Sequence, residues 1–174
     1  MNDYGAPAQA EAAVEVWGFD GKKVETVPLT GEIAPRSALL LGKLPASRFG
    51  SEKELKERFL EVVLTAKVDG QTAKHRNEWY FDFFKSCELG DAVVDAIPAE
   101  RNGTWTVTLT TDKPAFFVWA NVSGIRGEFN DNSFALFPGR PVTLTFTPKD
   151  GAATFADFAK ALTVKHLRQT YAGR

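Results

Sequence analysis

Apolar and polar residues alternate with a period of two along much of the chain. The clearest case is residues 104–110, where Trp105, Val107 and Leu109 alternate with threonines. This alternation is typical of a strand with one buried face and one solvent face. Further alternating or continuous apolar segments lie at 14–27, 37–44, 59–68, 77–84, 115–122, 133–137 and 142–147. The pattern predicts an all-β protein.

Turn-forming pairs divide these segments into hairpins. Asp20-Gly21 and Asp69-Gly70 each follow an apolar segment, and such pairs accept the backbone angles of a tight hairpin turn. We therefore expect one hairpin over residues 14–27. Residues 59–68 and 77–84 are expected to form two further paired strands.

Two short helices are predicted among the strands. Ser51 can cap a helix near residues 51–57, and Glu54 can complete a capping box with it. Thr154 can cap a second helix, which carries phenylalanines on one side. Residues 163–167 then follow as a short strand or extended tail.

The composition changes between residues 85 and 99, where small and acidic residues surround Pro98. Such a stretch fits a linker that leads into a new strand. We place the boundary near residue 87, which divides the chain into domains 1–87 and 88–174.

Charge and composition exclude several kinds of partner. The chain has 174 residues and a formal net charge of −1, so it has no field to attract nucleic acid. No apolar run reaches the roughly 18 to 20 residues that span a bilayer, so no membrane association is expected. The first residues do not resemble a signal peptide, and the single Cys87 permits a reducing compartment. These features favour a cytoplasmic location.

The chain lacks the motifs that announce common catalytic, metal and cofactor sites. His75 and His166 are the only histidines and lie far apart in sequence, so no metal site is predicted. Nucleophile-elbow and phosphate-binding glycine motifs are absent, so no cofactor is expected. Cys87 fits a small buried residue better than a nucleophile. A pair of glycosidase carboxylates among the 22 acidic residues is left open by the sequence.

Two aromatic residues are weak candidates for carbohydrate binding. In residues 115–122, Phe117 and Trp119 share one face while Phe116 and Val118 share the other. One face must be core, and the other is either a platform for a sugar ring or a surface buried against a neighbouring domain. Burial is the favoured alternative, as it is for the other aromatic residues Trp17, Trp79 and Tyr80.

A polar cluster precedes the strand predicted at residues 133–137. Asn130, Asp131 and Asn132 lie in a stretch that also holds Arg126 and Glu128. Asn and Asp side chains bond nearby main chain and tolerate turn conformations. The cluster is therefore interpreted as a structural turn and not as an active site.

Several motifs resemble one protein family. Phe129–Phe134 (FNDNSF), Phe137–Gly139 (FPG) and Thr163–Tyr171 (TVKHLRQTY), within FFVWANVSGIRGEFNDNSFALFPGRPVTLTFTPKDG and FAKALTVKHLRQTY, resemble the C-terminal end of bacterial β-mannosidases of glycoside hydrolase family 2. The upstream stretches VEVWGFDGKKV and HRNEWYFDFFKSCEL resemble the preceding immunoglobulin-like domain of those enzymes.

The resemblance implies two tandem immunoglobulin-like β-sandwiches. The first would have about 85 residues against roughly 100 for a complete domain, and is expected to be incomplete at its N-terminus. In the family, a sugar-binding-like domain, another sandwich and a catalytic barrel come first, and both catalytic glutamates lie on the barrel. Asn77-Glu78 matches a different, non-catalytic segment. No catalytic residue is expected in this chain.

The resemblance leads to three functional hypotheses. The first is a non-catalytic accessory region of a β-mannosidase-like enzyme, with the catalytic barrel and N-terminal domains as partners. The second is a freestanding carbohydrate-binding module that binds mannosides through Trp119 and Phe117. An independent enzyme is the third and least favoured. An incomplete sandwich would also expose a strand edge through which the chain could self-associate.

Overall fold

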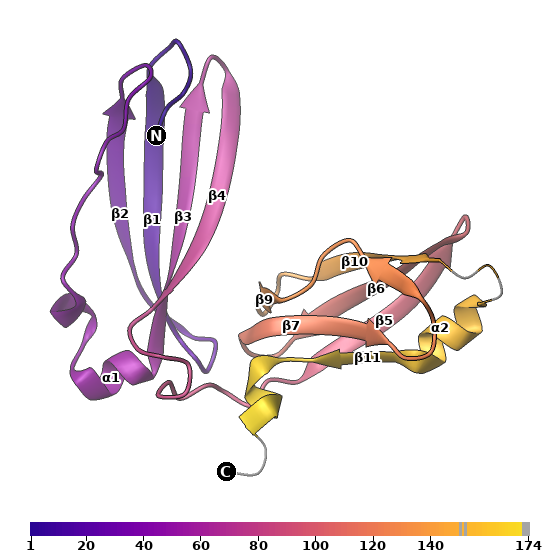
Figure 1. Ribbon diagram of the computed structural model, residues 1–174. Helices are drawn as coiled ribbons and strands as arrows, with labels where there is room; N and C mark the ends of the chain where they lie inside the picture. The colour runs from indigo at the N-terminus through magenta and orange to yellow at the C-terminus, as the bar shows by residue number, and fades with distance from the viewer. Residues whose placement is uncertain (150, 152, 172–174) are drawn as a thin grey trace. The chain divides into compact units, whose positions relative to one another are not determined.

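The structure is a computed structural model that describes residues 1–149, 151 and 153–171 (Figure 1). The chain divides into two compact units, Met1–Leu89 and Gly90–Arg174. Antiparallel strands predominate in both units, which confirms the predicted all-β class. In the part of the chain that the structure describes, no helix is long and apolar enough to cross a membrane.

The first unit is built on one four-stranded antiparallel sheet in the order β2-β1-β3-β4 (Figure 1). The four strands are β1 (Ala8–Gly18), β2 (Lys23–Ile33), β3 (Arg58–Val68) and β4 (Gln71–Tyr80). Both predicted hairpin turns are confirmed, with Asp69 and Gly70 at φ angles of 49° and 75°. The second hairpin differs from the expectation because β4 begins directly after Gly70, six residues before the predicted start at Asn77.

One face of this sheet is apolar and is covered by the segment that joins the two hairpins. Residues 38–45 form neither helix nor strand, yet Leu41 and Leu44 pack on the sheet. The short helices η1 (Ala46–Phe49) and α1 (Glu52–Lys56) follow. The continuous apolar residues of this segment lack strand alternation, and in this unit they form the second layer in place of a second sheet.

The predicted cap of α1 is confirmed in detail. The Glu54 amide donates to the Ser51 hydroxyl, and the Ser51 amide donates to the Glu54 carboxylate over 2.9 Å. The hydrogen bonds that the Ser51 amide and then the Ser51 hydroxyl donate to the Glu54 carboxylate lower the pKa of Glu54, and the charge of Arg58 adds to this shift. The same reciprocal pattern starts α2 (Phe155–Ala161), where Thr154 and Asp157 form a capping box.

The opposite face of the first sheet holds a small aromatic cluster. Phe59 is fully buried, and its ring centroid lies 5.3 Å from that of Phe19 and 6.1 Å from that of Tyr80. Beside it the buried Glu61 carboxylate accepts a hydrogen bond from Arg76 Nη1 at 2.9 Å. Burying a carboxylate is costly unless a cation lies close, so this pair fixes Arg76 of β4 against the sheet.

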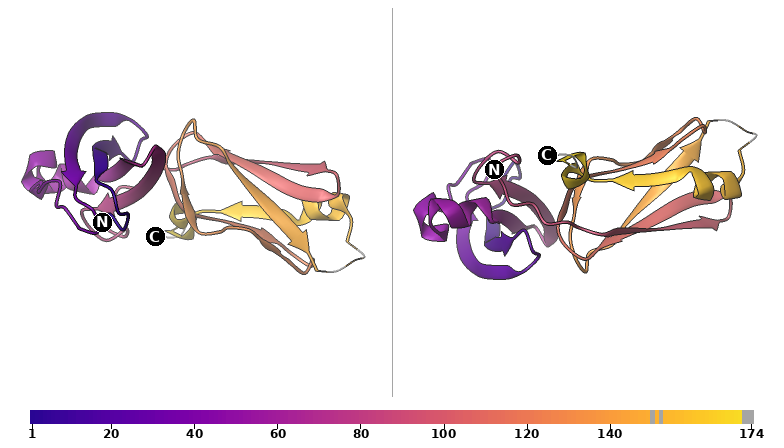
Figure 2. Two further views of the ribbon diagram at one scale, coloured as in Figure 1. Left: turned by 90° about the horizontal axis from the view of Figure 1, so that it is seen from above. Right: turned by 90° about the horizontal axis from the view of Figure 1, so that it is seen from below.

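The second unit is a sandwich of two antiparallel sheets that lie face to face (Figure 2). One sheet has the order β5-β6-β10-β8, and the other has the order β11-β7-β9. The strands are β5 (Val94–Arg101), β6 (Thr104–Thr111), β7 (Ala115–Val122), β8 (Gly127–Phe129), β9 (Phe134–Leu136), β10 (Val142–Pro148) and β11 (Leu162–Lys165), and a final turn of helix, η2, covers Leu167–Tyr171.

The core of the second unit comes from alternate residues of both sheets. Val107 and Leu109 of β6 and Leu144 of β10 pack against Val118 of β7 and Leu136 of β9. The alternation at residues 104–110 is thus confirmed as a strand with its apolar side inward. At one end, α2 closes the sandwich with Phe158, which packs on an aromatic cluster.

The predicted linker is partly a strand. Residues 81–93 lack helix and strand, but β5 begins at Val94 and includes Pro98, which lies opposite Val107. Proline lacks an amide hydrogen and is accepted at a sheet edge, and β5 is an edge strand. Of the small and acidic residues that suggested a linker, Asp95 and Ala99 are exposed positions of this strand, and Ala96 is half-buried.

His166 links the end of the chain to the start of the second unit. Its side chain is buried, and Nε2 lies 3.1 Å from the Ala92 carbonyl oxygen. Burial lowers the pKa of His166, and the Ala92 carbonyl and the charge of Asp91 oppose that shift only in part.

We expect the second unit to lose stability as the pH falls below about 6.5, the usual histidine pKa. There the unfolded chain takes up a proton at His166 more readily than the folded chain, and this loss continues until the pH passes the lower folded pKa. Urea unfolding at pH 7.5 and pH 5.5 measures the effect. His166→Gln should reduce the difference between the two pH values, whereas the exposed-site control His75→Gln should keep it. An equal difference in all three proteins would contradict the assignment.

Candidate functional site

The outer face of β7 carries two exposed aromatic side chains, Phe117 and Trp119, which we call the β7 aromatic patch. Phe117 is 47% exposed and Trp119 is 39% exposed, while the alternate residues Phe116, Val118 and Ala120 are buried. Phe117 has a φ of 49°, and the register of β7 with β9 shifts between Ala115 and Val118. A bulge therefore sets the direction of this strand where the patch begins.

Polar groups from β11 border the β7 aromatic patch. Lys165 lies directly opposite Trp119, and its Nζ is 5.9 Å from the centroid of the Trp119 ring. Thr163 lies opposite Asn121, and its hydroxyl donates to the Asn121 carbonyl at 3.3 Å. Two aromatic faces beside the Lys165 ammonium and the Thr163 hydroxyl suit contact with a sugar ring or with another protein surface.

The polar cluster at residues 126–132 uses its side chains to hold main chain. Asn132 bonds both main-chain groups of Ala120 on β7, accepting its amide at 2.8 Å and donating to its carbonyl at 3.1 Å. The side-chain oxygen of Asn130 accepts the Thr145 amide of β10 at 2.6 Å. Asp131 makes a local bond, with its carboxylate accepting the Asn132 amide at 2.7 Å.

These bonds connect the two sheets of the sandwich, because Ala120 belongs to one sheet and Thr145 to the other. The outer members of the cluster are also engaged at the sheet edge: Lys149 pairs with Glu128 at 2.8 Å, and its amide donates to the Arg126 carbonyl. In this arrangement Asn130 and Asn132 hold main chain of both sheets, and the interpretation of Asn130, Asp131 and Asn132 as a structural turn stays a prediction.

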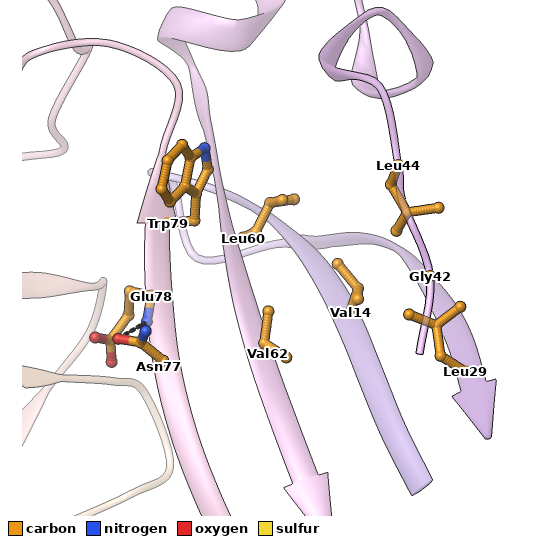
Figure 3. A pocket seen from close by; sticks show the side chains of 9 residues that line it. All are labelled: Val14, Leu29, Gly42, Leu44, Leu60, Val62, Asn77, Glu78 and Trp79. Carbon is orange, nitrogen blue, oxygen red and sulfur yellow. Dashed lines mark hydrogen bonds between the residues drawn. The ribbon is translucent and has the colours of Figure 1, made fainter. Parts of the chain in front are cut away.

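An apolar groove lies on the first unit, on the face covered by residues 38–45 (Figure 3). Its volume is about 480 Å³, and it is lined by Val14, Leu29, Gly42, Leu44, Leu60, Val62, Asn77, Glu78 and Trp79. Leu60 and Val62 form part of the floor, and Trp79 stands at the β4 side.

The sequence interpretation missed this groove because it assigned Trp79 to the core. The side chain is instead 64% exposed. Trp79 lies on β4 at one edge of the sheet, whereas the covering segment lies on the side of β2, the other edge, where Gly42 is close to Leu29 (Figure 3). No local pattern marks this gap, because a tryptophan at a sheet edge and one in the core look alike in the sequence.

Cys87 and the two histidines are the remaining residues that the sequence offered for chemistry. Cys87 is buried, and its burial raises the pKa of the thiol, which keeps it protonated and weakly nucleophilic. His75 and His166 lie in different units. Among residues 1–149, 151 and 153–171, no three His, Cys, Asp or Glu side chains gather closely enough to hold a metal ion.

Comparison with known families gives an assignment for the second unit. Residues 89–170 match the Ig-fold domain family of mannosidases. The second unit is an Ig-fold domain. The match starts at the division between the two compact units and ends within η2, so it covers both sheets and α2 of this Ig-fold domain. No curated protein matches the chain at a significant level.

Solved structures extend the likeness in fold to the first unit. A β-D-mannosidase from Dictyoglomus thermophilum is 21% identical with a TM-score of 0.62, and the match covers 95% of this chain and 19% of that one. The exo-chitosanase CsxA from Amycolatopsis orientalis is 18% identical with a TM-score of 0.51, covering 95% and 23%. The chain therefore spans about a fifth of the length of these enzymes. At such identities the likeness concerns the fold alone.

Proposed function

We propose that this chain is a non-catalytic accessory region of a larger β-mannosidase-like glycoside hydrolase. The observation that carries the proposal is the match of residues 89–170 to the mannosidase Ig-fold domain. The likeness in fold of nearly the whole chain to a fifth of a β-D-mannosidase supports it. The role is to support the catalytic barrel, and hydrolysis of terminal β-mannosides belongs to the parent enzyme.

The contacts of the polar cluster agree with a supporting role. Asn130 and Asn132, the groups that most suggested chemistry, bond to the main chain of β7 and β10. They hold the two sheets of the Ig-fold domain together. The β7 aromatic patch, with Lys165 beside it, is then a contact surface for the parent enzyme's other domains.

The proposal predicts no hydrolysis of p-nitrophenyl β-mannoside by this chain alone. When the chain is mixed with a separately expressed fragment that holds the parent enzyme's barrel, activity should rise above that of the fragment alone. We expect this gain because the chain would supply the support that the separated barrel lacks and would hold the barrel in its active geometry. Release of p-nitrophenol measures both results, and an unrelated Ig-fold protein serves as the control addition.

Two outcomes would contradict the accessory role. Turnover by the chain alone would require a catalytic carboxylate pair within it. Absence of both complex formation and a gain in activity on mixing would remove the supporting role.

The exposure of Phe117 and Trp119 favours one alternative, a freestanding carbohydrate-binding module. Titration with mannose and β-1,4-mannobiose separates the two functions. Millimolar or tighter binding that is lost in Trp119→Ala would favour the binding module, because stacking on the indole would then supply the affinity.

A further inference from the structure

The two edges of the first sheet differ in how they are protected. β2 carries Pro28 in its middle, and its pairing with β1 shifts in register between Val16 and Trp17. Both features hinder the addition of a further strand. β4 has neither, because it contains no proline and pairs with β3 in one unbroken register from Phe59–Tyr80 to Val68–Gln71.

β4 is also long and exposed. It has ten residues, and residues 71–77 are all exposed. The outer side of an edge strand presents a row of amide and carbonyl groups that can bond to another strand. β4 is therefore the edge of this sheet at which a further strand would be added.

When the β4 strands of two copies pair antiparallel, one register brings side chains of opposite charge opposite each other. Two copies keep their apolar faces on the same side only when residues of the same face lie opposite each other. A pairing centred on Asn77 meets this condition and places Arg76 opposite Glu78 of the other copy, twice by symmetry. Pairings centred on Arg76 or His75 instead bring Arg76 opposite Arg76 or Lys74, which is destabilising.

The intramolecular bond to Glu61 already holds Arg76 in place for an ion pair with Glu78 of the other copy. Its Nη1 donates to Glu61 Oε1 at 2.9 Å, and its side chain is still 39% exposed. A guanidinium has five N–H donors, so it can bind a second carboxylate beside the first. The intramolecular pair thus reduces the entropy that the arginine would lose on binding Glu78 of another copy.

The same register covers the exposed aromatic side chain of the edge. Trp79 lies opposite Leu60 of β3, on the face that holds the apolar groove. A pairing centred on Asn77 places His75 of the other copy directly opposite Trp79. The indole would then contact an imidazole on its outer side and the groove on its inner side (Figure 3).

We propose that the first unit self-associates as a two-fold symmetric dimer in which two β4 strands pair antiparallel, centred on Asn77. The interface is isologous, since the same residues contribute from both copies. It joins two four-stranded sheets into one continuous sheet of two copies. The proposal is independent of the proposed function, and its test measures association and not hydrolysis.

The test is disulfide trapping in the full chain. Asn77→Cys places two cysteines opposite each other at the symmetry centre, where cross-strand Cβ distances suit a disulfide. Under mild oxidation by oxidised glutathione we expect a covalent dimer to form at least about tenfold faster than in the control Thr26→Cys, because pairing raises the local thiol concentration. Thr26 is exposed on the other edge strand, and the wild-type chain reports any background from buried Cys87.

Mixed cross-links define the register. His75→Cys mixed with Trp79→Cys should give the heterodimer, and neither variant alone should cross-link as fast. Adding Glu78→Arg to Asn77→Cys should slow trapping to the control rate, because arginines then face each other. The proposal is overturned if Asn77→Cys cross-links no faster than Thr26→Cys, if Arg76→Cys is faster than Asn77→Cys, or if Glu78→Arg has no effect in a folded protein.

Discussion

Replacing Phe158 with alanine is expected to destabilise the second unit by about 3–5 kcal/mol. Phe158 is fully buried at the end of the sandwich, and its ring centroid lies 5.2 Å from that of Phe146 and 5.5 Å from that of Trp105. Alanine would leave a cavity between α2 and both sheets that rigid neighbouring rings cannot fill. Hydrogen exchange at increasing urea, read by mass spectrometry on peptides from the second unit, measures the loss.

The matched control for Phe158 is its neighbour on the same helix. Phe155 is half-buried and touches the outside of the cluster, so Phe155→Ala should cost clearly less. Exchange in peptides from the first unit reports whether the effect is local. A loss in Phe158→Ala no larger than in Phe155→Ala would show that Phe158 does not anchor α2.

Replacing Asn132 with alanine is expected to cost about 2–4 kcal/mol, because two main-chain groups of buried Ala120 lose their partner together. The same exchange experiment measures the loss, and amides of β7 and β9 should show it most strongly.

Two variants test the geometry at Asn132. Asp131→Ala removes a single local bond at an exposed site and should change stability much less. Asn132→Asp keeps the acceptor for the Ala120 amide but loses the donor to its carbonyl, so its stability should fall between the two alanine variants. Equal effects of Asn132→Ala and Asp131→Ala would mean that the link to β7 contributes nothing to stability.

Asn130–Asn132 shows how far local chemistry can be inferred from sequence. Asn and Asp favour turns through their own side chains, and this property predicted a turn before the strand at Phe134. Asp131 makes such a local bond. Asn130 and Asn132 instead bond residues 15 and 12 positions away, on strands of different sheets, and no local pattern contains that information.

The errors in strand position have the same origin. Pro98 and its acidic neighbours have the local properties of a linker, and only the place of β5 at a sheet edge makes them acceptable in a strand. The largely polar segment 71–76 likewise hid the start of β4, whose outer position requires little apolar surface. The three-residue strand β8 was too short to give an alternation signal.

The sequence by itself determined the all-β class, the two hairpin turns of the first unit, the capping box of α1, the N-cap of α2 and the alternating core strand at residues 104–110. These features depend on neighbouring residues and on side-chain periodicity, which are properties of a short segment. Only the tertiary structure decided the strand order, the exposure of Trp79, the groove beneath it and the partners of Asn130 and Asn132. Each of these depends on which distant segment packs against a residue, and that contact forms only when the whole sheet is assembled.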